Sequence, residues 1–173
     1  MSDKKKPALK QLITDLQSND DAIILNALEN SRSIGTTEVT PLLIQLLLNE
    51  NEEVQLTAER ILHSLKDSAS AAVIIQSLDN PELKAVYPKL IATFWMAGLD
   101  ATPYLTRLVK QAITGSFLEC IEVFSVIENI EPEDLPHDQE MESLLLLNAY
   151  FENNKKEEKT ELLKDIARML QQS

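Results

Sequence analysis

The chain has 173 residues, enough for one domain with a substantial core or for about four to five helical hairpins. Its 16 basic and 28 acidic residues give a formal net charge of −12, so the average surface repels phosphate backbones and we expect no nucleic-acid partner. Three glycines and 5% aromatic residues argue against a β-rich fold, whereas Leu, Ala, Glu and Lys are abundant and favour helices. We therefore predict an all-α protein.

The chain shows no targeting or membrane signal. No apolar run approaches the roughly 20 residues that a membrane-spanning helix needs, and no signal-peptide pattern follows Met1. The single cysteine, Cys120, excludes an intramolecular disulfide. We therefore expect a cytoplasmic protein with no membrane partner.

Helix start and stop signals divide the chain into five helical pairs. Pro7 and Pro81 suit first turns, and Gly35 and Gly98 follow predicted helix ends. Pro88 lies inside a predicted helix and is expected to bend it. In chain order, the predicted helices are residues 7–17, 21–34, 39–48, 52–65, 69–78, 81–97, 101–113, 117–130, 139–151 and 155–170.

Apolar residues return at a fixed step of 31 positions along most of the chain. Three series follow this step: Leu12, Leu43, Ile74 and Leu105; Leu16, Leu47, Leu78 and Val109; and Ile13, Ile44 and Ile75. Such an interval is typical of repeat proteins, in which one unit cannot bury its apolar face alone and stacked neighbours complete the core. We therefore predict helical hairpins that share one continuous interior.

The C-terminal part departs from this step. Residues 131–142 hold six acids, two prolines and no Lys or Arg, which predicts a solvated connection that becomes helical only near Met141. The alternative is that this acidic stretch binds a cation or a basic partner. The last helical pair has predicted apolar faces at Leu144, Leu145, Leu147 and Ala149 and at Leu162, Leu163, Ile166 and Met169. Because terminal units of helical arrays are atypical, we interpret this pair as a cap.

Two segments share a turn followed by a helical pattern. An acidic residue or Asn is followed by an aliphatic residue and then by Ala four positions later, in Asp20-Asp21-x-Ile23-x3-Ala27 and in Asn51-x-Glu53-Val54-x3-Ala58. This pattern resembles the HEAT-repeat family over roughly residues 9–130. The resemblance implies a right-handed α-solenoid of about four HEAT-like hairpins, in which the second helices line a concave surface. It also implies a protein-binding scaffold, although a minority of the family bind bilins or act on alkylated DNA.

The predicted organisation has three parts. Residues 1–6 are expected to be a flexible N-terminal tail, and residues 7–130 the HEAT-like array. Residues 131–173 are expected to form the acidic connection and the C-terminal capping hairpin.

Alignment of the predicted second helices places candidate partner-binding residues in two rows. One row holds Arg32, His63, Trp95 and Glu128, and the other holds Glu29, Arg60, Ala92 and Ser125. A large aromatic anchor between polar groups is typical of a binding hot spot, so we predict that Trp95 contacts a partner. The alternative is that Trp95 packs in the core with Phe94, Tyr87 and Tyr104.

The sequence contains no strong catalytic signature. Isolated glycines exclude a phosphate-binding loop, and one cysteine excludes a paired-cysteine metal site. Glu59 and His63 share a helical face but lack a third metal ligand nearby. Cys120 lies among apolar neighbours, so we expect a buried thiol rather than a nucleophile or an attachment site for a bilin.

We therefore expect a non-catalytic scaffold that binds a protein or peptide partner and needs no cofactor and no metal. One alternative is a ligand-attaching or lyase-like protein that uses Cys120 or His63. The other is a subunit of a larger homo-oligomer, joined through apolar residues at the ends of the array such as Leu9, Leu163 and Ile166.

Overall fold

A computed structural model describes residues 5–34, 37–153 and 157–171 of the chain. Within these ranges the protein has ten α-helices, four short 3-10 helices and no β-strand, which confirms the predicted all-α class. The predicted stop at Gly35 and most of the predicted tail lie outside the described residues, and α1 already includes Lys5 and Lys6.

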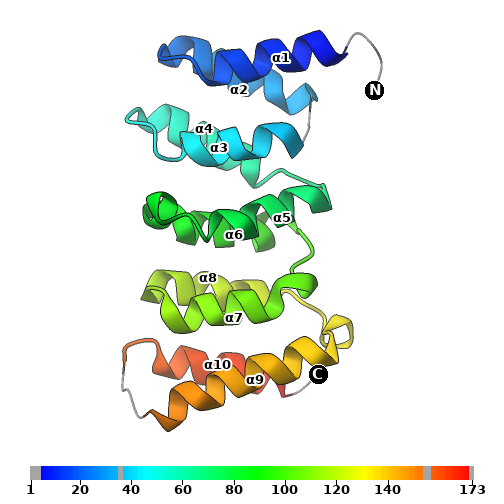
Figure 1. The fold of residues 1–173 in the computed structure, drawn as a ribbon, viewed down its shortest axis with the longest axis vertical. Coiled ribbons are helices and arrows are strands. Elements are labelled where there is room, and N and C mark those ends of the chain that lie inside the picture. The colour runs from blue at the N-terminus through cyan, green and yellow to red at the C-terminus, as the bar shows by residue number, and fades with distance from the viewer. Residues whose placement is uncertain (1–4, 35–36, 154–156, 172–173) are drawn as a thin grey trace. The chain divides into compact units, whose positions relative to one another are not determined.

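The helices are found close to the predicted positions (Figure 1). In chain order they are α1 (Lys5–Leu16), α2 (Asp21–Ile34), η1 (Thr37–Val39), α3 (Thr40–Leu46), α4 (Glu52–Leu62), α5 (Ser68–Ser77), η2 (Pro81–Val86), α6 (Tyr87–Ala97), η3 (Thr102–Tyr104), α7 (Leu105–Thr114), α8 (Phe117–Glu128), η4 (Pro132–Asp134), α9 (His137–Glu152) and α10 (Thr160–Leu170). By their contacts they form two compact units, Met1–Val86 (unit 1) and Tyr87–Ser173 (unit 2). The division predicted from sequence, after residue 130, stays a prediction.

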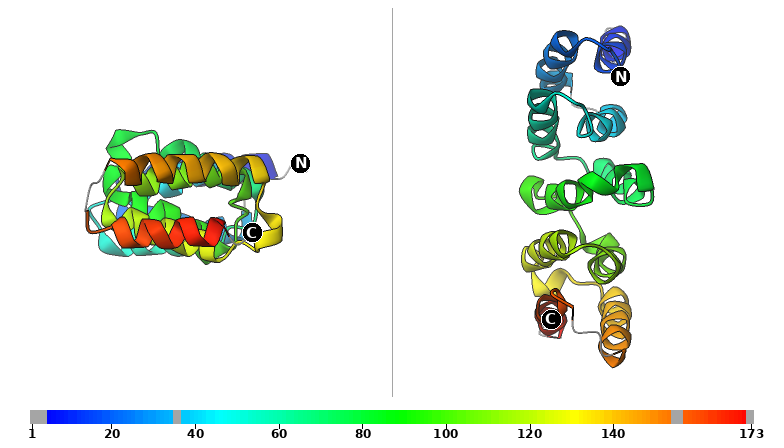
Figure 2. Two further views of the ribbon diagram at one scale, coloured as in Figure 1. Left: turned by 90° about the horizontal axis from the view of Figure 1, so that it is seen from below. Right: turned by 90° about the vertical axis from the view of Figure 1, so that its left-hand side faces the viewer.

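Unit 1 is built from helical pairs. Helix α1 packs against α2, and α3 packs against α4. The pairs are stacked, because α2 also contacts α4 and α3 also contacts α5. Figure 2 shows the result as two layers, with α2 and α4 in one and α3 and α5 in the other.

Unit 2 follows the same plan. Helix α7 packs against α8 and α9 against α10. One layer holds α6, α8 and α10, with α8 in contact with both neighbours, and the other holds α7 and α9 (Figure 2). Helix α8 is therefore the central element of its layer.

The two longer predicted apolar series are buried, and no member is more than 4% exposed. In the third series only Ile44 is buried, whereas Ile13 and Ile75 are half-buried. Each side chain of the two longer series lies on a helix or at its last turn and faces the interior of its own unit. Burial of one Val, Leu or Ile side chain contributes about 1.5 to 3 kcal/mol, so these eight residues form a large share of the two cores.

The second helices of unit 1 follow a step of 30 rather than 31 residues. Ile23, the aliphatic position of the HEAT-like pattern, is 44% exposed, and Ile24 is buried in its place, as Val54 is 30 residues later. Hydrogen bonds between the pairs show the same offset, since Asn51 Nδ2 donates to Asp21 Oδ2 at 2.9 Å. The one-residue difference rotates α2 by about 100° relative to the predicted register.

Pro88 does not bend the middle of a helix. The predicted helix 81–97 is instead a 3-10 helix, η2, followed by α6, which begins at Tyr87. Pro88 is the second residue of α6, where the first-turn N–H groups have no intrahelical acceptor, so its missing donor disturbs nothing.

The acidic connection is shorter than predicted. Helix α9 begins at His137, four residues before Met141, with Asp138 and Glu140 in its first turn. Acidic residues there interact favourably with the positive end of the helix dipole, which explains the early start.

The predicted apolar faces of the last pair are partly wrong. Leu145 is 65% exposed and Ala149 is also exposed, whereas α9 buries Ser143 and Leu147, which lie one turn apart. On α10 the prediction is closer, because Leu163 and Ile166 are fully buried within unit 2. These two residues are therefore not available for contacts between copies of the chain.

A polar network joins η1 and α3 to the start of α5. Asp67 is the N-cap of α5, and its Oδ1 accepts hydrogen bonds from Ser70 N at 2.9 Å and from Thr37 Oγ1 at 2.8 Å. The buried hydroxyls of Thr40 and Ser70 are 2.9 Å apart. Partial burial of the Asp67 carboxyl acts to raise its pKa, but the hydrogen bonds from Ser70 and Thr37 act against it, and the pKa lies below its ordinary value.

We expect Asp67→Ala to lower the free energy of unfolding by about 1 kcal/mol at neutral pH, because an N-cap is lost. Since the folded pKa is lower than the unfolded one, the carboxylate contributes fully above the unfolded pKa of about 3.9 and less as the pH falls through the folded value. Urea unfolding of both proteins over a pH series tests this. If the difference in the free energy of unfolding between the two proteins stays constant into strong acid, the role assigned to the Asp67 carboxylate is wrong.

Candidate functional site

Trp95 lies on the surface of α6. It is 38% exposed, whereas its neighbour Phe94 is 1% exposed and packs edge-on against Tyr104 with the ring centroids 6.2 Å apart. Successive helical residues point about 100° apart, which explains why one ring enters the core and the next leaves it. Trp95 is therefore not part of the aromatic core cluster considered as the alternative.

The indole ring is held in place by α8. Trp95 Nε1 donates a hydrogen bond to Glu122 Oε2 at 2.9 Å. The predicted row has Glu128 next to Trp95, but the residue that bonds to the indole is Glu122, six positions earlier on α8. A ring fixed in this way loses less conformational entropy when a partner covers it.

Trp95 borders a pocket of about 380 Å³ within unit 2. The pocket has an apolar base of buried side chains and an exposed acidic rim. The base includes Phe94, Leu99 and Val126, and the rim includes Asp100, Glu131 and Asp134. Most of the lining comes from the C-terminal ends of α6 and α8 and from the segments that follow them.

Gly98 shapes the pocket by ending α6. Its φ is 67°, the left-handed conformation that glycine adopts without a Cβ penalty. Leu99 N then donates to Phe94 O at 2.9 Å, the six-to-one bond of a Schellman motif. The turn directs Asp100 to the rim, where its Oδ1 accepts from Thr102 N at 3.0 Å and from Thr102 Oγ1 at 2.7 Å.

In unit 1, two of the candidate residues lie together. Glu29 of α2 and Arg60 of α4 line a groove of about 370 Å³. Arg60 Nη2 donates to Thr57 Oγ1 at 3.0 Å, and Thr57 lines the same groove. The structure therefore brings together Glu29 and Arg60, which are neighbours in the second predicted row.

The remaining candidate residues are more scattered. His63 is the half-buried C-cap of α4, and the side chain of Arg32 lies outside the described part of the structure. Glu128, at the end of α8, is exposed and borders another hollow beside Leu135 and Met169. Glu128 does not line the Trp95 pocket, although it belongs to the same unit.

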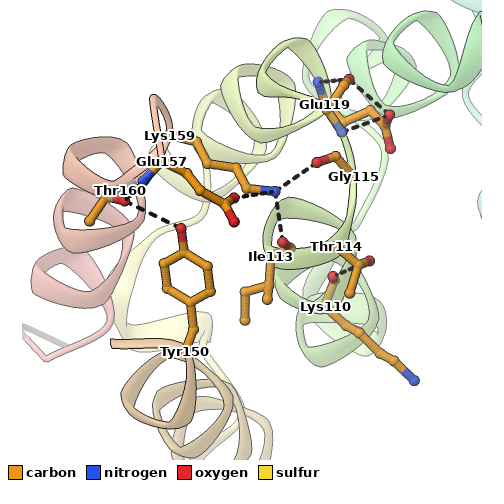
Figure 3. Close-up of polar contacts among 10 residues, drawn as sticks. Lys110, Ile113, Thr114, Gly115, Glu119, Tyr150, Glu157, Lys159 and Thr160 are labelled. Atoms are coloured by element: carbon orange, nitrogen blue, oxygen red, sulfur yellow. Dashed lines mark hydrogen bonds and ion pairs between the residues drawn. The ribbon is translucent and has the colours of Figure 1, made fainter. Parts of the chain in front are cut away.

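A buried lysine, which the sequence patterns did not single out, joins the start of α10 to the end of α7 in unit 2 (Figure 3). Lys159 Nζ donates to Ile113 O and Gly115 O, both at 2.7 Å, and lies 3.8 Å from Glu157 Oε2. These carbonyls lie at the C-terminal end of α7, where a cation interacts favourably with the helix dipole. The ammonium thus stabilises the turn between α7 and α8.

Cys120 is fully buried on α8, as predicted. Burial raises the pKa of the Cys120 thiol to about 11, although the charge of Lys159 acts to lower it. At neutral pH the thiol is protonated and shielded from solvent, whereas a nucleophile requires an accessible thiolate.

We expect the native protein to react very slowly with a thiol-directed disulfide reagent at pH 8, because both the exposure and the thiolate fraction of Cys120 are small. In denaturant the same thiol should react at the rate of a free cysteine. The absorbance of the released thiolate measures both rates. If the folded protein is labelled as fast as the unfolded one, Cys120 is a reactive residue and the prediction is wrong.

Two further observations concern other kinds of site. Among the described residues, no three or more His, Cys, Asp or Glu side chains are close enough to hold a metal ion together. In the same part of the chain, none of the helices has both the length and the apolar composition needed to cross a membrane.

The acidic rim of the Trp95 pocket was only partly identified from the sequence. Glu131 and Asp134 lie in the stretch 131–142, for which binding of a cation or a basic partner is the alternative, but the sequence does not relate Asp100 to them. The three rim residues lie outside the α-helices, where hydrophobic periodicity carries no information. A comparison of the chain with protein-family models, with curated proteins and with solved structures finds no match.

Proposed function

We propose that this protein is a HEAT-like right-handed α-solenoid that acts as a non-catalytic scaffold and binds a protein or peptide partner on its second helices. The 31-residue interval of buried apolar residues supports the repeat interpretation. So does the packing inside each unit, where α2 lies on α4 and α8 lies between α6 and α10.

The exposed Trp95 is the observation that carries the binding proposal. Tryptophan is enriched among the residues that dominate binding energy, and here it stands beside a pocket with a buried apolar base and polar groups around it. The hydrogen bond to Glu122 fixes the ring before any partner arrives. This arrangement suits a side chain of a partner that enters the pocket and packs against the indole.

Selection from a displayed library of random peptides tests this function. We expect the native chain to enrich peptides whose binding is lost with Trp95→Ala. Leu118→Ala is the matched control, because Leu118 is an exposed apolar residue of α8 that does not line the pocket. The proposal is wrong if no peptide is enriched, or if the enriched peptides bind Trp95→Ala as tightly as the native protein.

A further inference from the structure

We infer that the Trp95 pocket binds the Lys or Arg side chain of a basic peptide segment. This inference rests on the proposed function and adds the chemistry of the partner. Three features of the pocket support it: its charge, its aromatic wall, and its apolar base.

The charge of the pocket has one sign. Among its described lining residues are Asp100, Glu131 and Asp134 and no Lys or Arg. The surrounding sequence has the same bias, since residues 111–153 include ten acids and no Lys or Arg. A cationic side chain therefore meets a complementary potential there, whereas an acidic one is repelled.

The aromatic wall also favours a cation. Among aromatic side chains, tryptophan offers the most favourable ring face to an ammonium or guanidinium group. The Glu122 carboxylate, 2.9 Å from the indole nitrogen, orients the ring and adds negative charge at its edge.

The base of the pocket suits the rest of a Lys or Arg side chain. Both have an aliphatic stem that packs on apolar surface while the charged group stays at a polar rim. Phe94, Leu99 and Val126 supply the apolar surface below the rim. A volume of about 380 Å³ is large enough for one such side chain.

A metal ion is a poorer fit to the same carboxylates. In the described part of the chain, they do not form a group of three that converges on one point, as a metal ion requires. A long organic cation makes one contact with the ring and others with separate carboxylates, so it does not need such convergence.

Titration with three capped peptides of alternating sequence, Ala-Lys, Ala-Gln and Ala-Glu, tests the inference. Trp95 is the only tryptophan, so its fluorescence reports on the pocket directly. We expect the Ala-Lys peptide to change the emission and to bind more weakly as salt rises, and the other two to leave the emission unchanged. An Ala-Gln peptide that binds equally well would overturn the inference.

Charge variants separate a specific pocket from general attraction to an acidic protein. We expect Asp134→Asn and Glu131→Gln each to weaken binding of the Ala-Lys peptide about threefold to tenfold. Glu38→Gln is the matched control, because Glu38 is an exposed acid of unit 1 and should have no effect. Equal weakening by all three variants contradicts a site at the pocket.

The library selection distinguishes the two proposals. If it yields peptides that depend on Trp95 but are not enriched in Lys or Arg, the basic-peptide inference fails and the scaffold function stands. If it yields no Trp95-dependent peptide, the scaffold function fails as well.

Discussion

Phe94→Ala is expected to lower the free energy of unfolding by about 3 to 5 kcal/mol. The ring is 1% exposed and contacts Tyr104 edge-on, so its removal loses both the transfer free energy and the packing around the resulting cavity. Such a loss is a large fraction of the stability of an ordinary domain. Urea unfolding followed by Trp95 fluorescence measures it, because the only tryptophan lies in unit 2 beside the substituted residue.

Trp95→Ala is the matched control for this substitution. The two aromatic residues are neighbours on α6, but Trp95 is partly exposed and we expect a cost of about 1 kcal/mol or less. Because this variant has no tryptophan, its urea unfolding is measured by circular dichroism instead of fluorescence. If Trp95→Ala instead costs as much as Phe94→Ala, Trp95 is a core residue and its assignment to a binding surface is wrong.

Gly115→Ala is expected to destabilise unit 2 by about 3 kcal/mol, because the new methyl group has no room. A Cβ at this position would lie 2.7 Å from the backbone oxygen of Gln111 and still closer to Glu119 Oε2. The Glu119 carboxylate is buried and accepts hydrogen bonds from Gln111 Nε2, Ser116 N and Ser116 Oγ, so it cannot move without losing them.

Gly98→Ala provides the control for Gly115→Ala. At Gly98 nothing lies within 4 Å of an added Cβ, so the cost comes only from the positive φ and is about 1 kcal/mol. Thermal unfolding of the two variants compares a steric cost with a conformational one. A Gly115→Ala variant as stable as Gly98→Ala would show that the buried Glu119 carboxylate is not held as described.

Local signals in the sequence predicted the helices well. The boundaries predicted for α2 agree with the structure, and Asp20 Oδ1 accepts from Ala22 N at its start. Gly98 ends α6 as its position suggested. These signals work because each depends on backbone groups only a few residues away. The sequence contains one more local signal, which the predictions did not use: Ser116 and Glu119 have the spacing of a capping box and form that motif at the start of α8.

Features that depend on contacts between distant segments were harder to predict. The register of α2 is set by packing against α4, and a shift of one residue exposes Ile23 and buries Ile24. The rim of the Trp95 pocket joins Asp100 to Glu131 and Asp134, which no periodicity relates. Lys159 likewise bonds to carbonyls more than 40 residues away, at Ile113 and Gly115. Tertiary packing determines such contacts, so a pattern within one helix does not reveal them.

The central claim is that a partner binds at the surface formed by Trp95 and its pocket. Amide chemical shifts of the labelled full chain, recorded while the Ala-Lys peptide is added, test it most directly. The account predicts shift changes at the Trp95 indole N–H, at residues 98–102 and at residues 126–134, with unit 1 unaffected. Changes confined to other residues, or spread evenly over the acidic surface, would contradict it.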